Sequence, residues 1–304
     1  MATNRPGSTA RLAGFLALLV SLHGAALAQL PFEVIGLADG LPQSQLPTMA
    51  QDRDGFLWIG TLGGLGRFDG TGIETFLTKD GLPSNHIGEL LLDRTGTLWI
   101  TTLAGVARWR EHRLERYPAA GAVRCRAVAE DPKGRIWLGT EQGLLRCEGD
   151  QCVTVLGGAS SQMVVYDVYA APGMTFAATS RGVFRVDSGG ESKEACPPGI
   201  GEDSRAVALT TEGLWVGTST RGLWLRKGAD WAPVALLPRG AREIYRISIE
   251  PSGTFYVATG DSGLFLRRPG AAGFERWSTE NGLPSNVVNF AFEVWLTVPA
   301  DFLY

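Results

Sequence analysis

A block of about 40 residues recurs along this chain, and no other sequence feature limits the possible folds as strongly. The clearest copies begin at Asp52, Asp93 and Asp131 and read DRDGFLWIGT, DRTGTLWITT and DPKGRIWLGT. Three weaker copies follow, and every copy has a large aromatic residue at the same place, which we call the anchor. The anchors are Trp58, Trp99, Trp137, Phe176, Trp215 and Tyr256.

Each copy predicts four short strands. In the second copy, an apolar segment leads into an Asp-x-x-Gly turn, in which Gly96 can supply the positive φ that such turns need. An alternating segment with Trp99 follows, and then a hairpin. Four antiparallel strands in a unit of about 40 residues make one blade of a β-propeller, and stacked blades bury the anchors between them. The expected strands of this copy are 87–92, 97–101, 105–109 and 114–117.

A second motif joins the units. It reads Asp-Gly-Leu-Pro before the first and second copies, at Asp39 and Asp80, and Asn-Gly-Leu-Pro after the sixth, from Asn281. Gly and a φ-locked Pro suit a sharp crossing from an outermost strand to the next innermost strand. We therefore call these segments joints.

The two ends of the repeat region indicate a further, incomplete unit. Residues 32–35 resemble an outermost strand, and 287–292 resemble an innermost strand, with Trp295 at the anchor spacing. The predicted fold is an all-β propeller of four-stranded blades, with six full blades and an incomplete seventh that could close by pairing the two ends. We also expect the chain to be the front piece of a longer protein, interrupted near Glu293.

The first 28 residues predict a secretory signal peptide. Arg5 and Arg11 precede a short apolar segment, and Ala26-Leu27-Ala28 forms a small-x-small cleavage site. The apolar segment is too short for a typical transmembrane helix, although a retained anchor stays an alternative. The expected domains are the signal peptide (1–28), the propeller (29–298) and a short tail (299–304), in the periplasm or outside the cell.

Charge and residue types exclude several kinds of site. The 31 acidic and 28 basic residues are scattered without a basic stripe, which argues against a nucleic-acid partner. Cys147 and Cys152 flank a turn and could form a disulfide across a hairpin of an exported protein. Outside the signal peptide, His86 and His112 are isolated, so we expect no catalytic constellation, no metal site and no cofactor.

A propeller ligand is expected at the mouth of the central channel, on the face where the joints and the loops between second and third strands emerge. His86 and Arg221 depart from the repeat, and such departures can carry specificity. Asn85 and Asn286 recur with the joint, so they could instead only brace its turn. The candidate ligand-binding residues are His86, Asn85, Arg221, Asn286, Gln45 and Asp261.

These motifs resemble the two-component regulator propeller family, whose repeat combines a GLPSN-type joint, D-x-x-G-x-L-W-I-G-T and G-L-x-R-F/Y. The resemblance covers about residues 30–298, with three good copies at Asp52, Asp93 and Asp131 and three degraded ones. It implies the extracytoplasmic sensor part of a histidine kinase or diguanylate cyclase, often with carbohydrate-like ligands. The 304 residues carry no kinase, cyclase or transmembrane sequence, so signalling would need the missing C-terminal region.

Three functions remain open from the sequence. The favoured one is a periplasmic sensor that binds a small molecule or glycan, attached to the membrane only through the missing region and dimeric through a fused signalling domain. The second is an extracellular scaffold for protein–protein contacts. The third is a secreted propeller lyase or glycosidase, which would need clustered acid and base groups at the channel mouth.

Overall fold

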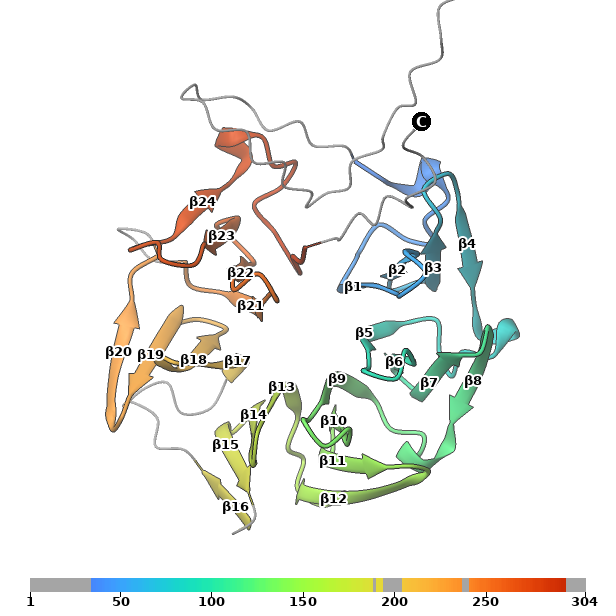
Figure 1. The fold of residues 1–304 in the computed structure, drawn as a ribbon, viewed down its shortest axis with the longest axis horizontal. Coiled ribbons are helices and arrows are strands. Elements are labelled where there is room, and N and C mark those ends of the chain that lie inside the picture. Colours follow the sequence, from blue (N-terminus) through green and yellow to red (C-terminus); the bar gives the residue numbers. More distant parts are fainter. Residues whose placement is uncertain (1–33, 188–189, 194–203, 237–240, 294–304) are drawn as a thin grey trace, which may run out of the picture.

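The structure, a computed structural model, describes residues 34–187, 190–193, 204–236 and 241–293. Within these ranges the chain forms six four-stranded sheets arranged around a central axis (Figure 1). The expected signal peptide, Trp295 and the tail lie outside the described residues. No helix in the described ranges is long and apolar enough to cross a membrane.

The first three blades follow the strongest copies of the repeat. Blade 1 contains β1 (Thr48–Gln51), β2 (Leu57–Gly60), β3 (Leu65–Phe68) and β4 (Ile73–Phe76). Blade 2 contains β5 (Ile87–Leu92), β6 (Leu98–Thr102), β7 (Gly105–Arg110) and β8 (Arg113–Tyr117). Blade 3 contains β9 (Cys125–Glu130), β10 (Ile136–Thr140), β11 (Gly143–Glu148) and β12 (Gln151–Gly157).

The other three blades have the same plan although their repeats are weaker. Blade 4 contains β13 (Val165–Ala171), β14 (Met174–Thr179), β15 (Gly182–Asp187) and β16 (Gly190–Lys193). Blade 5 contains β17 (Ser204–Thr210), β18 (Gly213–Thr218), β19 (Leu223–Lys227) and β20 (Asp230–Val234). Blade 6 contains β21 (Ile244–Ile249), β22 (Phe255–Thr259), β23 (Leu264–Arg267) and β24 (Glu275–Trp277).

Within each blade the strands pair antiparallel in chain order, and the first strand lies nearest the axis (Figure 1). Short 3-10 helices occupy joints, where Gly and Pro turn the chain inward. They are η1 (Leu37–Asp39), η2 (Thr78–Asp80), η3 (Pro118–Ala120) and η4 (Thr279–Asn281). The six anchors are all buried in second strands, so the prediction of six four-stranded blades is confirmed.

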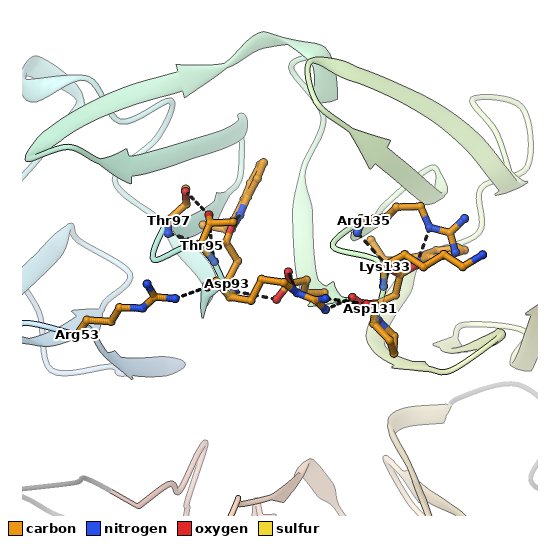
Figure 2. Close-up of polar contacts among 12 residues, drawn as sticks. Arg53, Asp93, Thr95, Thr97, Asp131, Lys133 and Arg135 are labelled. Atoms are coloured by element: carbon orange, nitrogen blue, oxygen red, sulfur yellow. Dashed lines mark hydrogen bonds and ion pairs between the residues drawn. The ribbon is translucent and has the colours of Figure 1, made fainter.

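The Asp of each strong repeat fixes both its turn and its anchor. Asp93 Oδ1 accepts hydrogen bonds from the Thr95 and Thr97 amides at 2.8 and 2.9 Å, and its Oδ2 accepts one from Trp99 Nε1 at 2.8 Å. Asp131 holds its turn and Trp137 in the same way (Figure 2). One carboxylate thus ties the turn between the first and second strands to the core.

Arginines that follow these aspartates join neighbouring blades. Arg53 of blade 1 donates to the Arg94 carbonyl of blade 2 (Figure 2). Arg94 in turn reaches blade 3, where its Nε contacts Glu130 Oε1 at 2.5 Å and its Nη1 contacts the Pro132 carbonyl at 2.6 Å. These contacts hold three successive turns in register on one face of the ring.

The glycine of the W-x-G-T motif allows blades to pack closely. A Cβ on Gly217 would lie 2.4 Å from Ile244 Cγ2 of the next blade. Equivalent collisions would occur at Gly60 with Ile87 and at Gly139 with Val165, at 2.8 and 2.9 Å. The glycine is therefore required by the packing between blades and not by the backbone conformation.

The incomplete seventh blade is not shown by the structure. Residues 34–36 and 282–293 form no strand, and the other residues expected in it lie outside the described ranges. Residues 282–293 instead run between blade 6 and blade 1 (Figure 1). The Val288 amide donates to the Thr259 carbonyl at 2.9 Å, just as the Ile87 amide donates to Thr61 at 3.0 Å. This segment therefore lies where a following blade would begin its first strand.

Candidate functional site

A cavity of about 730 Å³ opens at the mouth of the central channel. It lies on the face where joints and the loops between second and third strands meet. Gln45 and His86 come from joints, Leu103 and Ser219 come from the loops, and first strands supply much of the remaining wall. This is the face on which the sequence predicts ligand binding.

The wall is built from irregular positions in the first strands. In blades 3 to 6 the pairing between the first and second strands shifts by one residue near the start of the first strand. A shift of this kind leaves one residue outside the ladder and redirects its side chain. The four residues without a ladder partner all line the cavity, and we call them the bulge arc: Arg126, Tyr166, Arg205 and Tyr245.

The bulge arc alternates guanidinium and phenol groups. The Tyr166 ring lies between two arginines, with Arg205 Cζ 4.1 Å and Arg126 Cζ 5.8 Å from its centre. Stacked cation–π contacts of this kind favour a fixed orientation of each side chain. The Tyr245 hydroxyl forms a hydrogen bond with the Glu243 side chain. Burial is the main cause that raises the pKa of this hydroxyl, and the negative charge of Glu243 is the second.

A further cation, Arg124, accompanies Arg126 on the blade 3 side of the cavity. Arg124 Nη1 and Arg126 Nη2 both contact Glu141 Oε1, each at 3.0 Å. Burial and the charges of these two arginines lower the pKa of His86. His86 is therefore neutral at neutral pH, and its imidazole offers one donor and one acceptor to the cavity.

Glycine replaces a bulge residue in blade 2. A Cβ on Gly88 would lie 2.7 Å from the Cys125 carbonyl oxygen and 2.8 Å from Thr101 Oγ1. No side chain fits there without movement of these atoms. Bare backbone therefore lines the cavity beside His86.

A charge cluster, which we call the axial triad, joins Arg246 of the cavity wall to two buried carboxylates, Glu89 and Asp167. Arg246 of blade 6 contacts Glu89 of blade 2, and its Nη1 lies 3.6 Å from Asp167 Oδ1 of blade 4. Each carboxylate also accepts a backbone amide from the following blade, Val128 at 2.8 Å and Val207 at 2.9 Å. Burial raises the pKa of Asp167 and lowers the pKa of Arg246.

Only Gln45 and His86 of the six predicted ligand-binding residues line this cavity. Asn85 Oδ1 accepts the Thr78 amide at 2.7 Å, and Asn286 Oδ1 accepts the Thr279 amide at 2.9 Å. Both asparagines therefore brace joint turns, which is the alternative that the sequence left open.

The other two predicted residues lie in loops between second and third strands. Arg221 is exposed, its amide donates to Thr218 Oγ1 at 2.9 Å, and its carbonyl accepts from Trp224 at 2.9 Å. Asp261 accepts the Arg242 amide at 3.4 Å. Neither contributes to the lining of the channel-mouth cavity.

The bulge arc and Arg124 were not singled out from the sequence. Arg126, Tyr166, Arg205 and Tyr245 occupy the same position in successive first strands. Their distances from the anchors differ by one residue between blades, so an alignment on the anchors alone does not place them in one column. At this position of the first strand, blades 3 to 6 have a large polar or aromatic residue. This recurrence is the sequence signal for the bulge arc.

Of the described cysteines, Cys125 lines the cavity, whereas Cys147 and Cys152 do not. Cys147 and Cys152 form a disulfide between β11 and β12. Cys125 is a buried free thiol, and burial raises its pKa to about 12. Among the described residues, no group of three or more His, Cys, Asp or Glu side chains could hold a metal ion.

The comparisons with known proteins agree with this architecture. The family model of the two component regulator propeller matches residues 40–63 and 120–142. No curated protein sequence matches the chain.

Solved propellers share the fold at low identity. The extracellular domain of a hybrid two component system from B. thetaiotaomicron has a TM-score of 0.71 at 18% identity, over 85% of this chain and 38% of that chain. PorZ, a surface component of the type-IX secretion system of Porphyromonas gingivalis, has a TM-score of 0.59 at 15% identity, over 85% and 45%. Virginiamycin B lyase from Staphylococcus aureus has a TM-score of 0.59 at 13% identity, over 76% and 83%.

The chain is therefore a β-propeller, and two stretches of its repeat region match the family model of the two component regulator propeller.

Proposed function

We propose that this propeller is the ligand-binding sensor domain of a two-component or cyclic-di-GMP signalling receptor, and that it works in the periplasm or outside the cell. The observation that carries the proposal is the cavity of about 730 Å³ at the channel mouth, with its wall of bulge residues. The repeat family and the fold shared with an extracellular sensor domain support it.

The arrangement suits recognition because the scaffold and the variable positions are separate. Buried anchors such as Trp99 and Trp137 hold the blades, whereas the bulge positions differ from blade to blade. Binding residues commonly stand on irregular segments that a rigid scaffold positions. Such a wall can change its ligand without a change in the core.

The side chains of the cavity favour a hydroxyl-rich ligand such as a glycan. Tyr166 and Tyr245 provide aromatic surface, while Gln45, His86 and Ser219 provide hydrogen-bonding groups. Aromatic surface combined with a few polar groups is typical of pre-formed small-molecule sites. The function we propose is therefore binding and not catalysis.

A thermal-shift screen of the purified full chain against mono- and oligosaccharides tests the proposal. A sugar present at one hundred times its Kd stabilises the folded state by about 2.7 kcal/mol. The Tyr166→Ala variant should lose the shift, whereas Arg113→Ala, on an exposed outer strand, should keep it. A shift that survives in Tyr166→Ala would place binding elsewhere and contradict the proposed site.

Two outcomes would favour the other functions. Stable complexes with a protein from the same compartment, without a response to any sugar, would favour a scaffold. Cleavage of an added sugar polymer, followed by mass spectrometry, would favour a lyase or glycosidase. Either result would overturn the sensor proposal in its present form.

A further inference from the structure

The charged side chains that line the cavity are mostly cations: Arg124, Arg126, Arg205 and Arg246, with Glu243 as the acidic side chain among the lining residues. On the blade 3 side, Arg124 and Arg126 share one oxygen of one carboxylate, Glu141 Oε1. Within the described part of the chain, no other acidic side chain pairs with these two arginines. On the blade 6 side, Glu243 lies beside Tyr245, and Arg205 and Arg246 also line the cavity.

Two guanidinium groups that share one acceptor oxygen keep most of their donors for another partner. Each guanidinium carries five N–H donors in a planar fork, and a carboxylate or sulfate can accept two of them side by side. The side chains of Arg124 and Arg126 are 34% and 33% exposed, so solvent and solutes reach them. Burial is the main cause of the lowered pKa of His86, and the charges of Arg124 and Arg126 lower it further, so their positive charge reaches this cavity-lining residue.

We propose that the cavity binds a sugar that carries a carboxylate or sulfate group, and that Arg124 and Arg126 hold this anionic group. This inference rests on the proposed function, because it uses the same cavity. The ring of the sugar lies against the Tyr166 side of the bulge arc. Its neutral hydroxyl groups face Glu243 and Tyr245, which offer hydrogen-bonding groups.

Glu141 occupies part of the anion site in the unliganded protein. Its side chain is 38% exposed, so it can leave the arginines at modest cost when a ligand anion arrives. Glu141 therefore competes with the ligand, and its removal should strengthen anion binding. A neutral sugar does not compete with Glu141 and should show no such effect.

Isothermal titration of the full chain with three probes tests the proposal. The probes are digalacturonate, its dimethyl ester and sodium sulfate, which separate the charged sugar from the neutral sugar and from the free anion. We expect digalacturonate to bind about tenfold or more tightly than the ester, because charge-assisted hydrogen bonds are stronger than neutral ones. We expect sulfate alone to bind more weakly than digalacturonate, because it makes no contact with the tyrosines.

Three variants check the residues. Arg124→Gln and Arg126→Gln should each weaken digalacturonate binding by about tenfold, and Glu141→Gln should strengthen it. The control Arg113→Gln removes one exposed arginine from β8, outside the cavity, and should leave binding unchanged. Circular dichroism melts of all four variants report whether each one folds.

The results separate this inference from the proposed function. Equal binding of digalacturonate and its ester would overturn the anionic ligand but leave a sugar sensor intact. Equal binding of sulfate and digalacturonate would reduce the site to a simple anion site and would also overturn it. No binding of digalacturonate, with a hit for a neutral sugar in the thermal-shift screen, would overturn this inference alone. Weaker digalacturonate binding by Glu141→Gln, in a folded variant, would contradict the competition between Glu141 and the ligand.

Discussion

The indole nitrogen of Trp99 donates a 2.8 Å hydrogen bond to the carboxylate of Asp93, which lies 6 residues earlier in the chain. This contact links the turn between β5 and β6 to the aromatic residue that packs against the next blade. The same pair recurs as Asp52 with Trp58 and as Asp131 with Trp137. The strong repeats therefore share a bonded pair as well as a spacing.

The Asp93→Ala substitution should lower the free energy of unfolding by about 1–3 kcal/mol, because it leaves the buried indole N–H and the turn amides without their acceptor. Urea denaturation at pH 7 measures the loss. Asp93→Asn keeps one acceptor oxygen and should lose less. Equal losses in the two variants would mean that only the negative charge is important.

The same pair predicts a pH dependence. Burial opposes ionisation of Asp93, but hydrogen bonds from Thr95, Trp99 and Thr97 outweigh it and lower the pKa of the carboxyl. A lowered folded-state pKa gives stability that is present above the ordinary carboxyl pKa and is lost as pH falls through the folded value. The wild type should therefore lose more stability than Asp93→Asn between pH 5 and about pH 2. Urea titrations at fixed pH values measure this difference.

The Arg246→Met substitution should destabilise the protein by about 3–5 kcal/mol, because Glu89 and Asp167 then remain buried without their cation. Both carboxylates are almost inaccessible, with side chains 5% and 6% exposed. Adding Glu89→Gln and Asp167→Asn to this variant should recover part of the loss. Equilibrium unfolding of the single and triple variants provides the measurement.

The sign of the pH effect identifies the uncompensated carboxylates. Burial raises the pKa of Asp167, so its protonated form favours the folded state. Its contribution is present at low pH and is lost as pH rises through the folded value. Arg246→Met should therefore gain stability, relative to the wild type, when the pH is lowered from 7 to 5. No gain would mean that water compensates the two carboxylates.

The Gly217→Ala substitution should lower the free energy of unfolding by about 1–3 kcal/mol, because the added methyl group must displace Ile244 of the next blade. Gly273→Ala is the matched control, since no atom lies within 4 Å of a Cβ at that position. Thermal melts of the two variants give the comparison. If both variants melt together with the wild type, the blades can separate without measurable cost.

Removal of the Cys147–Cys152 disulfide should cost about 2 kcal/mol, because the bond closes a short loop and constrains the unfolded chain. The double variant Cys147→Ala and Cys152→Ala tests this, with the reduced wild type as a second measurement.

Cys125 should not react with iodoacetamide at pH 8 in the folded protein, because its buried thiol has a pKa of about 12. Peptide mass spectrometry of native and unfolded samples measures the labelling of Cys125.

The sequence was sufficient for the ring of blades because the anchors recur with a regular spacing. Trp215 and Tyr256 sit in weak copies of the repeat, yet they occupy second strands just as Trp58 does. The hydrogen bond between the Val288 amide and the Thr259 carbonyl could not be predicted from the sequence. Whether residues 282–293 pair as a β-strand depends on the tertiary fold. Hydrophobic pattern alone predicts a strand there, whereas no second strand is described beside it.

The structure has a cavity on the face where the sequence predicts a ligand site, and two of the six candidate residues line it. Gln45 and His86 follow from the topology, because every joint returns to the channel mouth. Tyr166 and Arg205 line the cavity because the pairing between the first and second strands shifts by one residue at these positions. No local sequence pattern predicts this shift. The contact between Glu89 and Arg246 joins residues 157 positions apart, so it exists only once the ring has formed.

The axial triad has a mechanical consequence for the ring of blades. Arg246 connects blade 6 to blades 2 and 4 across the central axis. The distances between these blades therefore depend on ion pairs near the axis as well as on the packing of neighbouring blades. A movement of blade 6 away from blade 1 that widened the ring would also lengthen the contacts of Arg246 with Glu89 and Asp167. The lengths of the Arg246 ion pairs therefore depend on how far apart the blades lie across the ring.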